Sequence, residues 1–260
     1  MFERVIVSTD DSEFQKFWPM VSMAWGKFFP NVKLTCGFVT NRSEDDELVV
    51  KMREYGEVVL FPVIENIPTA SQGKMTRLIL ATTFGDEICL IDDIDSIPMQ
   101  SEYIKNVFSV EACQSLNDGS LLALAADVYK NSPHQGKFPM GYITGKGSTF
   151  KKFINPHSKD IKDLYPDWLD NKIDGKESVL NVPVENFSDE SLVRYLIQQY
   201  PVDVYHVDRN CDIQRYWIDR SWWNIDKTRL FEEDYVMCNF LRPYSVYKEY
   251  FEIIEEFLKK

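Results

Sequence analysis

Cysteine is scarce in this sequence, and long apolar runs are missing. Five of the 260 residues are cysteine, and no two of them form a Cys-x-x-Cys pair. We therefore expect neither a disulfide framework nor a zinc knuckle, but reduced thiols in a cytoplasmic protein. No stretch approaches 18 consecutive apolar residues, so we expect no membrane span. The first residues, MFER, lack the basic and apolar segments of a signal peptide.

Positive charge is also in short supply. The chain has 29 Lys and Arg residues against 41 Asp and Glu residues, a formal net charge of −12. This acid excess argues against nucleic acid and anionic membranes as partners, because both would repel the protein. Apolar residues make up 44% of the chain, which is typical of a globular protein and excludes a disordered or collagen-like one. Neither a repeat nor a linker divides the sequence, so we expect a single domain over residues 1–260.

The first half of the chain alternates between two hydrophobic periodicities. Short apolar runs predict strands, and apolar residues three and four apart predict helices. The strands are expected at 4–8, 33–40, 57–63 and 87–91, and the helices at 14–28 and 69–80, the second with Gly85 as its C′ residue. This alternation predicts an α/β fold with a mostly parallel sheet covered on both faces. Sheets of this kind bind ligands at the carboxyl ends of their strands.

The second half is less regular. We expect strands at 121–126 and 138–144, the latter followed by a turn at 145–147, and an irregular connection over 155–186. A helix is predicted from Ser188 to about Tyr200, where Pro201 ends it. An amphipathic helix is predicted over 244–260.

Three carboxylates follow the predicted strand at 87–91. In an extended chain Asp93 and Asp95 project to the same side, where both can bind one hard divalent cation, Mg²⁺ or Mn²⁺. Asp92 projects the other way, where it can accept hydrogen bonds from a ribose or a base. A surface turn before Pro98 explains the same residues equally simply.

A basic pair precedes these acids. Lys74 and Arg77 stand three residues apart on one face of the predicted helix at 69–80. Near a helix N-terminus such a pair favours phosphate binding, through its charge and the free backbone N–H groups. An ordinary solvated helix face is the alternative.

The string Asp93-Ile94-Asp95-Ser96-Ile97-Pro98, preceded by 73–78, resembles the Asp-x-Asp region of GT-A glycosyltransferases. It is most similar to the compact type of large algal DNA viruses and some bacteria. Further similarities lie in family order at 138–142, 168–170, 187–192, 218–220 and 242–244. The resemblance implies a GT-A, Rossmann-like fold with a nucleotide-sugar donor half over 1–100. The acceptor half and the C-terminal helix would then occupy 101–260.

The resemblance also implies roles for individual residues. Asn239 stands where relatives often have a histidine that binds the metal. Its amide oxygen suits a hard cation, but the third ligand stays open. The other implied roles are base binding by Thr9 and Asp10, donor phosphate binding by Lys74 and Arg77, metal binding by Asp93 and Asp95, and ribose binding by Asp92.

The implied activity is transfer of a sugar from a nucleotide diphosphate sugar, above all a UDP-sugar, to a carbohydrate acceptor. Mn²⁺ or Mg²⁺ would stabilise the departing diphosphate. An inverting enzyme also needs a carboxylate base, for which Asp189 and then Glu190 are the candidates, whereas a retaining enzyme needs none. Helix capping explains both acids without catalysis.

Two alternative functions stay open. A sugar-nucleotide pyrophosphorylase would need a glycine-rich, basic loop after its first strand, whereas residues 8–13 are acidic and contain no glycine. A nucleotide- or carbohydrate-binding module without catalysis is the other alternative.

Overall fold

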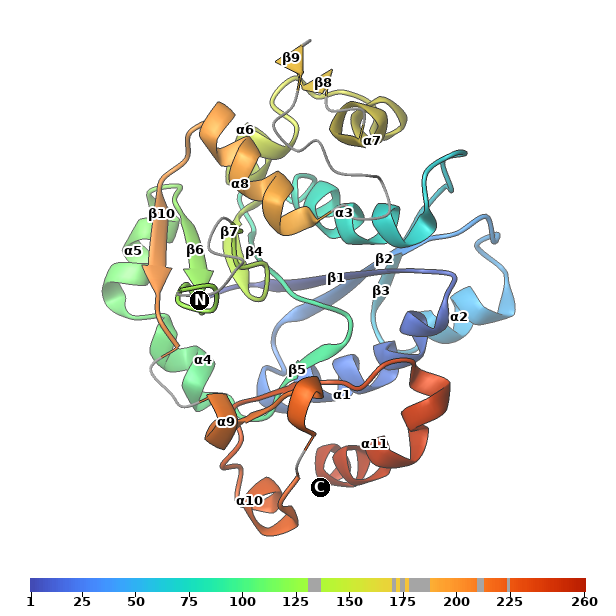
Figure 1. Cartoon of the computed structure of the whole chain (residues 1–260), viewed down its shortest axis with the longest axis vertical. Coiled ribbons are helices and arrows are strands. Elements are labelled where there is room, and N and C mark those ends of the chain that lie inside the picture. Colours follow the sequence, from blue (N-terminus) through green and yellow to red (C-terminus); the bar gives the residue numbers. More distant parts are fainter. Residues whose placement is uncertain (131–136, 170–171, 174–175, 178–187, 210–212, 224) are drawn as a thin grey trace.

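The computed structural model describes residues 1–130, 137–169, 172–173, 176–177, 188–209, 213–223 and 225–260. Within these residues, seven strands form a central sheet. Their order is β10-β6-β7-β4-β1-β2-β3 (Figure 1). The strands are β1 (Arg4–Asp10), β2 (Lys33–Val39), β3 (Glu57–Phe61), β4 (Ile88–Ile91), β6 (Leu121–Leu124), β7 (Ile143–Lys146) and β10 (Val204–Val207). Strand β7 runs antiparallel to both of its neighbours, and the other neighbouring pairs are parallel. The predicted α/β fold with a mostly parallel sheet is confirmed.

The sheet separates two hydrophobic cores. Along β1, Val5 and Val7 belong to one core and Ile6 to the other, as the two-residue period of a strand requires. All three side chains are at most 1% exposed. Burial of each such side chain contributes roughly 1.5–3 kcal/mol. Because both faces of β1 are apolar, the strand needs helices on both sides.

Helices cover each face of the sheet (Figure 1). On one face α3 (Thr69–Ala81) packs against β1 and β2 and contacts α6 (Gly147–Ile154) and α7 (Ile161–Leu169), while α8 (Asp189–Gln199) contacts α6. On the other face α1 (Trp18–Phe28) contacts α11 (Tyr244–Lys259). The rings of Phe17 and Phe240 stack beside α11, with centroids 5.1 Å apart.

The remaining elements connect these layers. A small sheet has the order β11-β12-β5. Its strands are β5 (Ser96–Pro98), β11 (Trp217–Ile218) and β12 (Met237–Asn239). A separate two-stranded sheet pairs β8 (Lys172–Ile173) with β9 (Lys176–Glu177). The short helices are η1 (Glu13–Phe17), α2 (Glu47–Arg53), α4 (Glu102–Val107), α5 (Val110–Asn117), α9 (Ile213–Tyr216), η3 (Arg220–Trp222) and α10 (Lys227–Phe231).

The strand predicted at 138–144 and the turn predicted at 145–147 are wrong. Tyr142 has φ +64°, outside the extended region, and β7 begins only at Ile143. Gly145 lies inside that strand, where an added Cβ would meet Leu121 Cδ2 at 2.7 Å and would require the Leu121 side chain to shift. Gly147 begins α6. The two glycines therefore allow close packing here and do not form a turn.

Two further expectations need correction. Helix α3 ends at Ala81 with Thr82 as its C-cap, so Gly85, at φ +56°, belongs to the turn that follows and is not the C′ residue. The connection expected at 155–186 contains helix α7, despite Pro166 inside it. The rest of that connection lies largely outside the described residues.

Among the described residues, no helix has both the length and the apolar character needed to cross a bilayer.

Candidate active site

A cleft of about 620 Å³ opens at the carboxyl ends of β1, β4 and β6, beside the start of β7. This is the edge that the sheet topology predicts for a ligand, and the size suits a small-molecule site. Predicted site residues line it from distant parts of the chain: Thr9, Asp10, Lys74, Arg77, Asp93, Asp95, Asp189, Glu190 and Asn239. Asp92 is not part of the lining.

The Asp-x-Asp pair lies in a turn between β4 and β5. The amide of Ser96 donates to the carbonyl of Asp93 at 3.1 Å, and the amide of Phe240 donates to the carbonyl of Asp95 at 2.8 Å. The extended chain expected at Asp93 and Asp95 is therefore wrong. Both residues nevertheless line the cleft.

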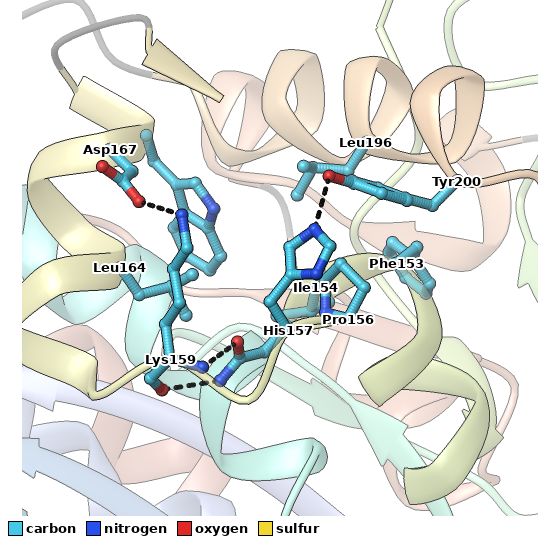
Figure 2. Close-up of a pocket in the computed structure, with 11 residues that line it drawn as sticks. Phe153, Ile154, Pro156, His157, Lys159, Leu164, Asp167, Leu196 and Tyr200 are labelled. Atoms are coloured by element: carbon cyan, nitrogen blue, oxygen red, sulfur yellow. Dashed lines mark hydrogen bonds and ion pairs between the residues drawn. The ribbon is translucent and has the colours of Figure 1, made fainter. Parts of the chain in front are cut away.

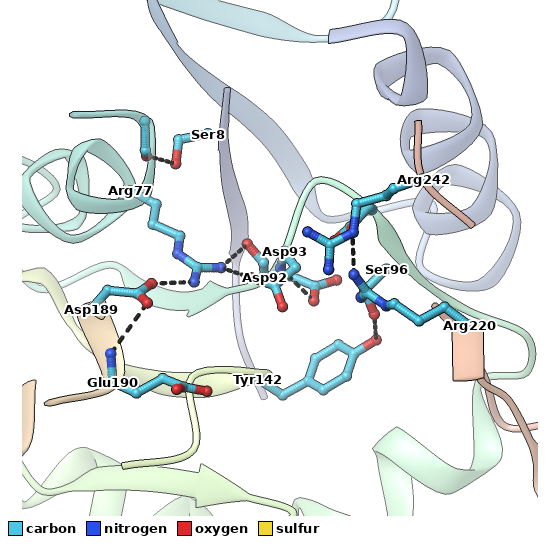
Figure 3. Close-up of polar contacts among 12 residues, drawn as sticks. Ser8, Arg77, Asp92, Asp93, Ser96, Tyr142, Asp189, Glu190, Arg220 and Arg242 are labelled. Atoms are coloured by element: carbon cyan, nitrogen blue, oxygen red, sulfur yellow. Dashed lines mark hydrogen bonds and ion pairs between the residues drawn. The ribbon is translucent and has the colours of Figure 1, made fainter. Parts of the chain in front are cut away.

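Arg77 joins the two acidic parts of the site. Its Nη1 donates to the Asp92 carbonyl at 2.8 Å and to the Asp93 carboxylate, and its Nη2 donates to Asp189 Oδ2 at 2.5 Å (Figure 3). Only 5% of Arg77 is exposed. Burial alone would lower the pKa of Arg77, but Asp93 and Asp189 raise it above its ordinary value. The predicted phosphate-binding arginine is thus held by carboxylates, whereas Lys74 lines the cleft one turn earlier.

Two further arginines bind the second carboxylate of the pair. Arg220 Nη1 lies 2.9 Å and Arg242 Nε 2.8 Å from Asp95 Oδ2, and both residues line the cleft. Burial raises the pKa of Asp95 to about 6, although Arg220 opposes this shift. For Asp93, burial acts in the same direction, but Arg77 holds its pKa below the usual value. Sequence reasoning assigned no partner to Asp95. Arg220 and Arg242 lie in the segments 218–220 and 242–244, and the similarity of these segments to the glycosyltransferase family was the one indication that they belong to the site.

Asp92 lies behind the cleft wall. Its side chain is fully buried, and its Oδ1 accepts a hydrogen bond from the Asp93 amide at 2.8 Å. Its Oδ2 has no hydrogen-bond partner among the described residues. Burial, reinforced by Asp93, raises the pKa of Asp92 well above its usual value. This position supports the turn beneath the Asp-x-Asp pair and does not support the expected contact with a ribose.

The oxygen donors at this edge fit a hard divalent cation. Asn239 pairs with Ser96 across β12 and β5, and its Nδ2 donates to Asp219 Oδ2 at 3.3 Å, a bond that does not use the amide oxygen. The described residues bring together no group of three or more His, Cys, Asp or Glu side chains suited to a metal. The carboxylates of Asp93 and Asp95 and the amide oxygen of Asn239 remain as candidate ligands for the cation. Mg²⁺ typically binds to such a small protein set and completes its shell with water and phosphate oxygens.

Asp10 ties the end of β1 to the start of α3. Its Oδ2 accepts a hydrogen bond from the Thr69 hydroxyl at 2.7 Å, and its Oδ1 accepts one from Ser12 at 2.5 Å. Thr9 and Asp10 are 3% and 6% exposed, and both line the cleft. Ser8 donates to the Gly73 carbonyl at 2.5 Å, which holds the helix close to the strand end. The residues expected to bind the base are therefore rigidly placed.

Helix α8 presents its first two residues to the cleft with different surroundings. Asp189 is bound to Arg77, and its side chain is 9% exposed. The Glu190 side chain is 21% exposed and pairs with Lys137 Nζ at 3.0 Å. Burial and the charge of Asp93 raise the pKa of Glu190 to about 7, against the opposing charges of Arg77 and Lys74. The Glu190 carboxyl thus changes protonation near neutral pH.

The cleft wall carries strained backbone. Ala125, after β6, has φ +54°, and Tyr142, before β7, has φ +64°. Both residues line the cleft. The left-handed region costs a residue with a Cβ roughly 1–3 kcal/mol, and such strain gathers at ligand sites. Tyr142 is held in place by its hydroxyl, which donates to Met237 Sδ at 2.9 Å.

A second hollow lies between α6, α7 and α8 (Figure 2). His157 and Tyr200 lie on one side of it, and Lys159 pairs with Asp167 at 2.7 Å on another. Its volume of about 20 Å³ is close to that needed for a single water molecule. The hollow is therefore too small for a nucleotide or a sugar.

No protein-family model matches the sequence, and no curated protein matches it either. Solved structures do match. The galactosyltransferase LgtC in complex with donor and acceptor sugar analogues is 13% identical, with a TM-score of 0.51 over 92% of this chain and 87% of that one. An active-site mutant of LgtC gives 14% identity and a TM-score of 0.52, over 92% of this chain and 88% of that one.

The glycosyltransferase GlyE of Streptococcus pneumoniae, in its apo form, is 14% identical with a TM-score of 0.53. The match covers the whole of this chain and 64% of the GlyE chain. None of these matches tests the resemblance to the algal-virus type, which stays a prediction. At such low identity they establish the fold, and the chain has the GT-A fold of nucleotide-diphospho-sugar glycosyltransferases.

Proposed function

We propose that the chain is a metal-dependent glycosyltransferase that moves a sugar from a nucleotide diphosphate sugar to a carbohydrate acceptor. The observation that carries this proposal is the cleft itself. Asp93 and Asp95 reach it from the end of β4, Lys74 from α3, and Glu190 from α8. The candidate cation ligands, a lysine proposed to bind phosphate and a carboxylate thus line one cavity in a GT-A fold.

The donor would bind along the ends of β1 and β4. Thr9 and Asp10 would contact the nucleoside, and Lys74 would contact the phosphates. Asp93, Asp95 and the Asn239 amide oxygen would hold Mn²⁺ or Mg²⁺, which supplies a Lewis acid for the departing diphosphate. Arg220 and Arg242 form ion pairs with Asp95 and add positive charge to the same region. The resemblance drawn from the sequence favours UDP as the nucleotide.

The acceptor would bind on the side of α8. Asp189 was the first candidate for a base, but its ion pair with Arg77 leaves it little exposed. Glu190 is more open to the cleft, and its pKa of about 7 suits a base that acts at neutral pH. In an inverting reaction Glu190 would take the proton of the acceptor hydroxyl, and Asp189 would orient Arg77. A retaining reaction would instead use Glu190 as a charge beside the reacting sugar.

The first test is a thermal-shift screen of UDP-, GDP- and dTDP-sugars with and without Mn²⁺, followed by assays of nucleotide release. We expect a metal-dependent rise in Tm with one nucleotide class, and release of the corresponding nucleoside diphosphate. The Asp95→Ala variant should lose release and keep the fold.

The same screen and release assays, together with an assay of nucleotide-sugar synthesis, separate the other candidate functions. Formation of a nucleotide sugar from a sugar phosphate and a nucleoside triphosphate would show a pyrophosphorylase. Metal-dependent nucleotide binding without turnover of any donor would show a binding module. Either result would overturn the proposed activity.

A further inference from the structure

We propose that Tyr129 and Lys137 are positioning residues that orient the Glu190 carboxylate in the cleft and favour its ionised form. Each of its two oxygens has its own donor. Lys137 Nζ lies 3.0 Å from Oε2, and the Tyr129 hydroxyl donates to Oε1. Ser188 Oγ adds a weaker bond to Oε2 at 3.2 Å. This inference rests on the proposed role of Glu190 as the base.

The three residues come from two distant parts of the chain. Glu190 is in the first turn of α8, whereas Tyr129 and Lys137 belong to the segment between β6 and β7. The amide of Phe138 donates to the Glu190 carbonyl at 3.1 Å, so the backbones are joined at the same point. All three side chains line the cleft. A carboxylate fixed from two sides keeps one orientation, which proton transfer within hydrogen-bond reach requires.

The surrounding charges make the two donors necessary. Asp93 and partial burial both favour the protonated form of Glu190, and Arg77 and Lys74 oppose them from α3. The neighbouring Asp189 is bound to Arg77, which reduces the positive charge that reaches Glu190. Lys137 is a cation in direct contact with Glu190. Its ammonium group and the Tyr129 hydroxyl stabilise the ionised form that a base must have.

The test compares Lys137→Met and Tyr129→Phe with Lys137→Arg and with Lys130→Met, which removes an exposed lysine seven residues earlier. The first readout is the pH dependence of kcat/KM for transfer. We expect Lys137→Met to move the acid limb to higher pH by about one unit. Its activity should then fall about tenfold below pH 7 and recover towards pH 9. Lys137→Arg should restore the wild-type limb, and Lys130→Met should leave it unchanged.

The second readout does not need activity. A ¹³C NMR titration of the side-chain carboxyl of Glu190, assigned by its loss in Glu190→Gln, should show a higher midpoint in Lys137→Met and Tyr129→Phe than in the wild type. An unchanged midpoint overturns the inference, and so does an activity loss that is uniform with pH. If the wild type turns over no donor, the proposed function fails, and the NMR midpoint still decides whether the two residues act on Glu190.

Discussion

Arg77 Nη2 lies 2.5 Å from Asp189 Oδ2, although 112 residues separate the two in the sequence. Both side chains are less than one tenth exposed, at 6% and 9%. The pair connects α3, beneath the donor side of the cleft, to the first residue of α8 on the other side. The same guanidinium also holds Asp93. The candidate metal site and the candidate acceptor site are thus mechanically joined by one buried cation.

The first prediction concerns the stability of this joint. Arg77→Leu leaves the buried carboxylate of Asp189 without its cation, and loss of one partner of a buried pair typically costs about 3–5 kcal/mol. We expect a decrease of that size in the free energy of unfolding, measured by urea denaturation.

The double variant Arg77→Leu/Asp189→Asn should recover part of this loss, because the unpaired charge of Asp189 is gone. Lys74→Met, on the same helix, should change the free energy of unfolding by less than about 0.5 kcal/mol. A loss below about 1 kcal/mol in Arg77→Leu would contradict the structural role.

The second prediction separates the acids that line the cleft from the one behind it. Asp93→Asn and Asp95→Asn should abolish the Mn²⁺-dependent Tm rise with nucleotide and lower the rate of transfer about 100-fold or more. Asp92→Asn is the matched control. Asparagine keeps the size of this buried residue and an acceptor for the Asp93 amide, so the Mn²⁺-dependent rise should persist. Its loss in Asp92→Asn would place Asp92 in ligand binding after all.

The third prediction concerns pH. The pKa of Glu190 is raised from 4.5 to about 7, so the folded state keeps a proton that the unfolded state has released. The stability contributed by this group is therefore fully present below pH 4.5 and falls as the pH rises to about 7. The total decrease is at most about 3 kcal/mol.

Urea unfolding of the wild type and of Glu190→Gln at a series of pH values measures this decrease. The difference between their free energies of unfolding should shift against the wild type between pH 4.5 and 7 and stay constant above. A difference that does not vary with pH would refute the raised pKa.

The fourth prediction contrasts two glycines. A Cβ at Gly147 would meet the Ala81 carbonyl oxygen at 2.7 Å and backbone atoms of Gly85 at 2.9 Å, none of which can rotate away. We expect Gly147→Ala to cost about 1–3 kcal/mol in the free energy of unfolding. Gly26 is exposed within α1 and has no atom within 4 Å of an added Cβ. Gly26→Ala should therefore stabilise the protein by roughly 0.5–1 kcal/mol. Equal effects at the two positions would contradict this packing.

Much of the first half could be predicted because both periodicity and end signals are local. The run at 4–8 became β1, the helix expected at 14–28 became η1 and α1, and the run at 33–40 became β2. The acidic turn after β4 was also recognisable, since three acids follow one apolar strand. These features depend on neighbours within a few residues, which a single sequence contains.

The errors share a different cause. Gly145 belongs to a strand because it pairs with Cys89 of β4, and the environment of Asp92 depends on packing behind β4. Arg220 and Arg242, which form ion pairs with Asp95, lie 125 and 147 residues after it in the chain. Such long-range pairings carry no local pattern. The predicted roles in base, metal and acceptor binding, and the division into two halves, stay predictions.

Strand β7 has one more consequence. Because it runs opposite to β4 and β6, Lys137 and residues 139–142 line the cleft as the chain enters the sheet, whereas the segments after β1 and β4 line it as the chain leaves. Two contacts fix the segment that leads into β7. The amide of Phe138 donates to the Glu190 carbonyl, and Ile143 is the first residue of the strand. Substitutions at residues 139–141 would change the side of the cleft near Glu190, whereas Tyr142 also contacts Ser96, next to Asp95. Under the proposed function, residues 139–141 would affect the acceptor more than the donor.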